Sequence, residues 1–388
     1  MRPRIGDVLA PNANNLGVLR LIAAIAVLIS HCALLKIGSE AAEPLASVMA
    51  FSLSDHALHA FFFISGLTIA ASLARARSYR EFIVARVLRI WPALIVVTLI
   101  LTLCVGPLLG RETASAYFAD PGWAEYIRKA VYLSAAGLNL PGVFSGNPHL
   151  PIANGSPWTL KYEVICYGLI AICAISAGGR HRLARTHLIA ISTAAAAAAM
   201  LLTPAGLYES FPGHLARFWF AFGLGVLTWQ YADRLRLSFW TVAGLGACLW
   251  VSRGGQFERP LSIVFTASLV LFLAILPAER TRRFTNRTDL SYGVYVTAWP
   301  ITQTIIEFFP DQPLLNVTLA TLLLSIAMAF ASWTLIEKPA MSLRPLLSRC
   351  LERFSRVAAI ARFPRRPQVA PVRANPTFQT SSATTPQS

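Results

Sequence analysis

Two ionisable side chains lie inside one strongly apolar segment near the start of the chain. The segment is RLIAAIAVLISH, with Arg20 and His31 at its ends. Eleven residues of helix make three turns plus about 20°, so the two side chains share a face roughly 16 Å apart along the axis. Ionisable groups inside membrane spans mark function more often than those in soluble cores. The alternatives are an arginine that reaches back to the membrane surface and a histidine satisfied in the core.

A carboxylate enters similar surroundings in the stretch SPWTLKYEVICYGL, which starts at Ser156. Glu163 follows Trp158 by five residues, which places it about 8 Å into the expected span, at a depth comparable to that of His31. A carboxylate in apolar surroundings needs a partner or takes up a proton. We therefore expect His31 and Glu163 to form an orienting pair or an acid–base relay.

Two arginines in FIVARVLRIWP offer a different chemistry. Arg86 and Arg89 are three residues apart and share a helix face. Paired arginines bind phosphate groups in a bidentate manner, and Arg20 on the same side of the membrane strengthens this interpretation. The alternative is that these arginines only mark the cytoplasmic side. Glu337, in the later stretch IEKP, is expected to pair with an inner arginine as a structural lock.

The composition requires that these residues be positioned by a membrane helix bundle. Of 388 residues, 55% are hydrophobic and only 13% are charged, and the mean hydropathy is +0.55. A soluble protein of this size carries more charge. Apolar blocks of roughly 16–22 residues, long enough to cross a bilayer as helices, recur along the chain. The ten expected spans are at approximately 16–35, 57–74, 88–107, 158–177, 187–203, 214–231, 239–252, 261–277, 289–309 and 315–336.

The basic charge reports topology and contact with anionic lipids. A net charge of +16 raises the possibility of nucleic-acid binding. Most Lys and Arg residues, however, fall at ends and loops that an alternating ten-span arrangement puts on one side of the membrane. That asymmetry is typical of cytoplasmic loops. We expect an all-α, polytopic membrane helix bundle of about ten transmembrane helices, with both termini cytoplasmic and no nucleic-acid partner.

The chain divides into four expected parts. Residues 1–15 form a short cytoplasmic lead, and residues 16–342 form the membrane domain. Residues 343–361 alternate basic and apolar residues at helical spacing, which is typical of an amphipathic helix on the inner leaflet. Residues 362–388 lack apolar periodicity and are predicted to form a disordered cytoplasmic tail. The six cysteines show no metal-ligand spacing, and we expect no metal.

Four further residues are candidates for contact with an acceptor. Tyr295 and Trp299 are four apart and share a helix face, so they can line a channel. Trp158 is a third aromatic candidate. The alternative for all three is an interfacial belt or core position. Asn154 lies in the long outer loop, where turn formation is the simpler explanation.

Five motifs in order resemble the membrane acyltransferase-3 family of polysaccharide and oligosaccharide O-acyltransferases. They are the Arg20-to-His31 element, HAFFFISGL at 59–67, FIVARVLRIWP at 82–92, SPWTLKYEVICY at 156–167, and LSYGVYVTAWPI at 290–301 with LIEKPAM at 335–341. The resemblance covers about residues 16–342. The sequence departs from the family pattern twice: His59 stands where an acidic residue is often found, and Ala298 replaces the histidine of the closing motif.

The resemblance implies ten or more spans and transfer of an acyl group from cytoplasmic acyl-CoA, most simply acetyl-CoA, to an outward-facing sugar hydroxyl. It makes His31 the catalytic base or acyl carrier, and Glu163 its partner. The acyl-CoA contacts would be Arg20, Arg86 and Arg89. We therefore expect an O-acetyltransferase of the bacterial inner membrane whose acceptor is a surface polysaccharide, a lipid-linked sugar or an exported oligosaccharide.

Two other functions remain open at this point. The transferred group could be succinyl or another acyl group. A transporter of small anions or sugars also uses buried ionisable groups. Against transport, the sequence has no internal repeat and no paired broken spans.

Overall fold

Helices make up the regular structure of this protein. The computed structural model describes residues 14–39, 42–76, 78–110, 113–134, 137–176, 182–236, 238–276 and 279–354, and every regular element within them is a helix. The long helices are α2 (Leu16–Ile37), α3 (Leu53–Arg75), α4 (Tyr79–Ile100), α8 (Leu160–Ser176), α9 (Arg182–Leu202), α10 (Phe211–Gln230), α11 (Phe239–Val251), α12 (Glu258–Ala274), α14 (Ser291–Phe308) and α15 (Leu314–Ser332).

Short elements extend or connect the long helices. They are η2 (Leu101–Val105), α5 (Gly106–Leu109), α6 (Ala114–Ala119), α7 (Gly122–Val131), η3 (Ser156–Thr159), η4 (Ala205–Leu207), α13 (Glu279–Arg287), η5 (Trp333–Glu337), α16 (Lys338–Ser342) and α17 (Arg344–Phe354). Of these, η2 and η5 are π-helical turns that continue α4 and α15. The predicted tail at 362–388 lies outside the described residues.

The number of membrane spans agrees only in part with the prediction. Each of the ten expected blocks overlaps one long helix. Among the described residues, six helical segments are long and apolar enough to cross a membrane. They are Leu16–Ile37, Leu53–Arg75, Tyr79–Leu109, Ser156–Ile175, Ala184–Leu202 and Leu314–Cys350. The helix α11 is apolar but has only 13 residues, and α12 has 17. The structure therefore confirms a multi-span helical bundle, without fixing the count at ten.

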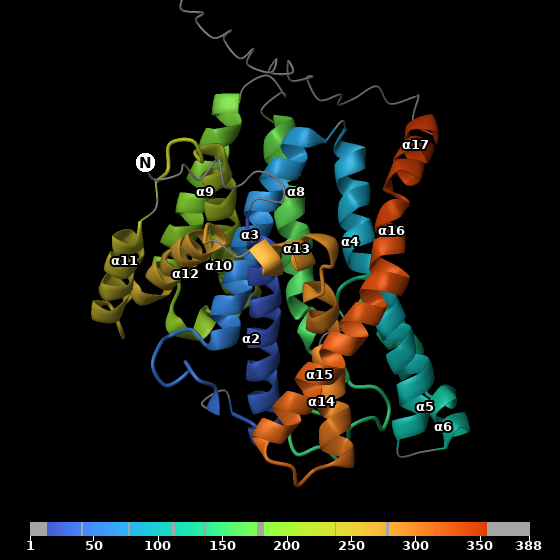
Figure 1. Cartoon of the computed structure of the whole chain (residues 1–388). Coiled ribbons are helices and arrows are strands. Elements are labelled where there is room, and N and C mark those ends of the chain that lie inside the picture. Colours follow the sequence, from blue (N-terminus) through green and yellow to red (C-terminus); the bar gives the residue numbers. More distant parts are fainter. Residues whose placement is uncertain are drawn as a thin grey trace, which may run out of the picture.

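The helix α2 lies at the centre of the bundle. It packs against α3, α14 and α15, while α3 packs against α10 and α12. Figure 1 shows α4, α16 and α17 along one side of the bundle and α11 and α12 along the other, with α2, α3 and α14 between them. Arg20 and His31 on α2 therefore face the interior from the same central helix.

Glycines allow the backbones of α3 and α10 to touch. A Cβ atom on Gly66 would lie 2.0 Å from the carbonyl oxygen of Phe222, and a Cβ on Gly225 would lie 2.1 Å from that of Phe63. No side chain fits at either position without moving a backbone, which is the use of small residues where membrane helices approach closely. The contact fixes Ser65, next to Gly66, against the interior of the bundle.

Candidate active site

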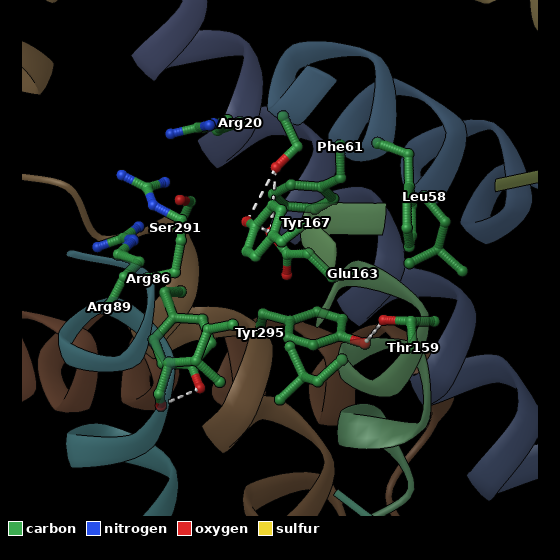
Figure 2. A pocket seen from close by; sticks show the side chains of 15 residues that line it. Arg20, Leu58, Phe61, Arg86, Arg89, Thr159, Glu163, Tyr167, Ser291 and Tyr295 are labelled. Carbon is green, nitrogen blue, oxygen red and sulfur yellow. Dashed lines mark hydrogen bonds between the residues drawn. The ribbon is translucent and has the colours of Figure 1, made fainter. Parts of the chain in front are cut away.

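A cavity of about 90 Å³ lies between α2, α3, α4, α8 and α14. Figure 2 shows its lining side chains. Arg20, Arg86 and Arg89 lie on one side, and Leu58 lies on the opposite side. Glu163 and Tyr167 lie between the two ends. The structure thus brings together the three arginines and the glutamate that the sequence singled out.

Neither Arg20 nor Arg86 forms an ion pair with a carboxylate of the described residues. Nη2 of Arg20 donates to Oγ1 of Thr68 at 3.1 Å. Nε of Arg86 is buried and has no hydrogen-bond partner among the described residues. The Arg86 guanidinium lies 5.8 Å from the ring centre of Tyr167, a cation–π distance. Both arginines line the cavity, so both can meet an anionic group that enters it.

Arg89 is held differently, by two carboxylates. It forms ion pairs with Asp289 at 2.7 Å and with Glu337 at 3.1 Å. The Glu337 side chain is only 3% exposed and also accepts from Oγ of Ser332 at 2.9 Å. The predicted pairing of Glu337 with an inner arginine is confirmed. The π-helical turn η5 ends at Glu337, in keeping with the occurrence of such turns at functional positions.

Glu163 is bound to two hydroxyl groups. Its Oε1 accepts from Oγ of Ser65 at 3.0 Å and from the Tyr167 hydroxyl, one helical turn further along α8. Oγ of Ser65 and the Tyr167 hydroxyl are themselves 3.2 Å apart. All three residues line the cavity. The cluster of Ser65, Glu163 and Tyr167 is therefore a compact hydrogen-bonded group placed between the cationic and the apolar ends.

His31 does not reach this cluster. Its ring packs edge-on against Trp299, with the ring centres 4.9 Å apart, and its buried Nδ1 has no hydrogen-bond partner in the described part of the chain. Arg20 contacts Thr68 on the antiparallel α3, which puts Ser65 level with about residue 23 of α2. His31 is eight residues further along, or roughly 12 Å. The structure does not bring His31 and Glu163 together.

We expected Glu163 and His31 to lie at comparable depth because we counted Glu163 five residues inward from Trp158, near the expected start of the span. The chain before it is already buried: Ala153 is 0% exposed, Asn154 3% and Ser156 0%. The loop before η3 thus enters the bundle before the helix begins. Glu163 consequently lies deeper than the count from Trp158 suggested, on the level of Ser65.

Tyr295 and Trp299 occupy successive layers of α14, on one face as expected. Tyr295 lines the cavity, and its hydroxyl pairs with Oγ1 of Thr159 at 2.6 Å and donates to the carbonyl of Ser156. Trp299, one turn further, donates from Nε1 to the carbonyl of Ile152 at 2.9 Å and packs on His31. Tyr295 and Thr159 both line the cavity, whereas Trp299 and His31 lie outside its lining.

Trp158 and Asn154 lie outside the lining of the cavity. Trp158 packs against His214, at a ring-centre distance of 4.7 Å, and against Phe218, at 5.7 Å. Nδ2 of Asn154 donates to the carbonyl of Val296 at 2.9 Å, and its Oδ1 accepts from the backbone N–H of Ser156 at 3.1 Å. Asn154 thus fastens the outer loop to α14. Contact of either residue with an acceptor stays a prediction.

The two positions that depart from the family pattern are also outside the cavity lining. His59 is 1% exposed and packs against Phe51, with ring centres 4.7 Å apart. Neither of its ring nitrogens has a hydrogen-bond partner among the described residues. Ala298 is 2% exposed, in an apolar cluster with Ala24 and Leu28. Neither departure alters the groups that face the cavity.

Sequence reasoning missed part of the site. Ser65 lies within the HAFFFISGL motif, but its contact with Glu163 was not predicted. Tyr167 was not singled out, although its spacing of four residues from Glu163 on a helix could have identified it. Asp289 was missed as well, and its role depends on a contact with Arg89 from another helix, for which the sequence carries no signal.

Comparisons with known proteins place the chain in a family. The acyltransferase domain family matches residues 14–337. An O-acetyl transferase of Shigella phage Sf6 is 26% identical over 336 residues, which cover 82% of this chain and 93% of the relative. Nodulation protein 10 of Rhizobium leguminosarum bv. viciae is 28% identical over 367 residues, covering 86% of this chain and 95% of the relative. No solved structure matches the chain.

The family match spans most of the membrane bundle and includes every residue described around the cavity. The helices long enough to cross a membrane lie within or overlap the same range. This multi-pass membrane protein belongs to the acyltransferase-3 family and is an acyltransferase.

Proposed function

We propose that this protein transfers an acetyl group from cytoplasmic acetyl-CoA to a hydroxyl of an exported or surface carbohydrate, as an O-acetyltransferase of the bacterial inner membrane. The observation that carries the proposal is the cavity, where two arginines that have no ion pair within the described part of the chain face a hydrogen-bonded carboxylate. The relative named O-acetyl transferase supports the choice of acetyl. Ten spans with both termini cytoplasmic complete the proposed arrangement, which the distribution of Lys and Arg favours.

The arginines account for recognition of the donor. Coenzyme A carries several phosphate charges, which guanidinium groups bind through charge-assisted hydrogen bonds. Arg20 and Arg86 meet these phosphates at the cationic end of the cavity. Arg89 lines the same cavity, but Asp289 and Glu337 already balance its charge. It therefore contributes to donor recognition by its position rather than by a free positive charge. The pantetheine arm then carries the thioester inward, toward Glu163.

The chemistry requires a base, because a sugar hydroxyl is a weak nucleophile near neutral pH. His31 takes the hydroxyl proton as the oxygen attacks the thioester carbonyl. The new C–O bond forms, the C–S bond breaks, and the thiolate of coenzyme A leaves and is protonated. Transfer through an acyl-histidine divides the same exchange into two steps. In either route the acyl group must reach His31, which packs on Trp299, one turn beyond the lining residue Tyr295 on α14.

The test uses purified protein in lipid vesicles with radiolabelled acetyl-CoA, together with mass spectrometry of the host's surface glycans. The wild type should release coenzyme A and produce acetylated glycan. His31→Ala should abolish transfer while the protein remains folded in the membrane. The matched control is His187→Ala, since His187 is exposed on α9.

Two results would contradict the proposal. Full activity of His31→Ala would remove His31 from the mechanism. A wild type that neither hydrolyses acetyl-CoA nor transfers acetyl, together with a gene deletion that leaves every glycan unchanged, would refute acetyl transfer. That result would favour transport of a small anion or sugar.

A further inference from the structure

The cavity has opposite chemical character at its two ends. The arginines occupy one end, and Leu58 occupies the other (Figure 2). Phe61 and Leu160 add apolar surface to the lining. Among the described lining residues, the only cationic side chains are the three arginines. A thioester donor whose phosphates lie near the arginines would direct its acyl group toward the apolar end.

Two aromatic rings and Leu58 border this apolar end. Phe61 is half-buried, and its ring centre lies 6.1 Å from that of Tyr295. Leu58, one turn before Phe61 on α3, is 5% exposed. The neighbouring Phe62 also lines the cavity, but it is stacked on Phe218 with ring centres 4.2 Å apart, so its ring is fixed by that contact. Of the two phenylalanines of α3 that line the cavity, Phe61 is thus the one whose ring can be removed without breaking a stacked pair.

We propose that Phe61, with Leu58, closes the acyl end of the cavity and restricts the donor to a short, uncharged acyl group. The inference rests on the proposed acetyl transfer and adds the residues that set acyl length. It also separates acetyl from succinyl, a choice that the sequence left open.

The volume favours a short acyl group. The free volume is about 90 Å³, whereas an apolar cavity of about 150 Å³ in another protein admits benzene. The bulk of coenzyme A must therefore lie outside this volume, with its phosphates at the arginine end. The apolar end is only part of the free volume, so it suits an acetyl group better than the larger succinyl, butyryl and hexanoyl groups.

The charge distribution acts in the same direction against succinyl. Its terminal carboxylate would enter an end bordered by Leu58 and Phe61, away from the arginines. Burying a carboxylate without a partner is costly, and the Glu163 carboxylate is nearby. Size and charge therefore both disfavour it.

The test compares acetyl-, propionyl-, butyryl-, hexanoyl- and succinyl-CoA with purified protein in lipid vesicles. Release of the coenzyme A thiol and the mass of the acylated product are measured for the wild type, Phe61→Ala and Leu58→Ala. One methylene that a pocket excludes or admits changes kcat/KM by roughly tenfold to 200-fold. We expect Phe61→Ala to raise the butyryl-to-acetyl ratio of kcat/KM by at least about tenfold, with succinyl-CoA still rejected.

The controls keep the inference separate from the proposed function. Phe330→Ala, on the outer face of α15 where Phe330 is 52% exposed, should keep the wild-type ratio. Retained acetyl transfer by Phe61→Ala shows that the variant is folded; if it is not, Phe61→Leu and Leu58→Ala carry the same test. Acetyl transfer with an unchanged ratio in these variants would overturn the inference alone, as would equal use of hexanoyl- or succinyl-CoA by the wild type. A wild type that transfers no acyl group would instead refute the proposed function.

Discussion

Replacing Arg89 by alanine should lower stability, whereas replacing Arg86 should weaken donor binding, although both arginines line one cavity. Arg89 forms ion pairs with Asp289 and with the deeply buried Glu337. Removing one partner from a buried ion pair costs about 3–5 kcal/mol, because it leaves the remaining charge without compensation. Arg89→Ala leaves two such carboxylates, so we expect a loss of about 3–5 kcal/mol in the free energy of unfolding.

Arg86 has no ion pair among the described residues and has a cation–π contact with Tyr167. Such a contact contributes about 0.5–2 kcal/mol, depending on its exposure, so Arg86→Ala should lose less stability than Arg89→Ala. Its effect should appear in donor binding. A hydrogen bond to a charged group contributes about 1.5–3 kcal/mol, which corresponds to a rise of roughly tenfold to 100-fold in the KM for acetyl-CoA.

The assay pairs two measurements on each variant. Detergent-induced unfolding gives stability, and thiol release at varied acetyl-CoA concentration gives KM. The double variant Arg89→Ala/Glu337→Ala tests the pairing directly, because the second substitution should cost much less when the first is already present. The reasoning would be refuted if Arg89→Ala were as stable as the wild type, or if Arg86→Ala had an unchanged KM.

Two further predictions concern the groups beside the arginines. Tyr167→Phe removes a hydroxyl that donates to Glu163, so kcat for acetyl transfer should fall by roughly tenfold, the effect of about 1.4 kcal/mol, with the folded yield unchanged; an unaltered kcat would show that this hydrogen bond is dispensable. Gly66→Ala puts a Cβ atom 2.0 Å from the backbone oxygen of Phe222, so the yield of folded protein by size exclusion should collapse. Gly168→Ala, with no atom within 4 Å of its added Cβ, is the matched control and should fold normally.

The sequence was informative where local spacing alone sets the geometry. The face shared by Tyr295 and Trp299 follows from helical periodicity, and both residues lie as expected on α14. The gathering of Arg20 with Arg86 and Arg89 was also expected, because all three lie near the same end of their spans. The pairing of Glu337 with an inner arginine required only that a buried carboxylate find a cation.

Features that depend on contacts between distant segments were not predictable. The depth of Glu163 depends on a loop that is buried before α8 begins, and polar composition usually indicates an exposed loop. Asp289 became part of the site only through its contact with Arg89, 200 residues earlier. The number of membrane spans was not predictable for another reason. Helices such as α11, with 13 residues, fall below the length that identifies a crossing from composition.

The glycine contact between α3 and α10 has a mechanical consequence. Two backbones that touch at Gly66 and Gly225 cannot slide without steric overlap. We therefore expect α3 and α10 to move together as a rigid pair. Passage of an acyl group from the cavity toward His31 must then come from the opposite side, where α14 carries Tyr295. This helix contains Pro300, and proline removes a backbone hydrogen bond and weakens the helix at that point. We expect α14 to be the part that bends, while α3 and α10 stay fixed relative to each other.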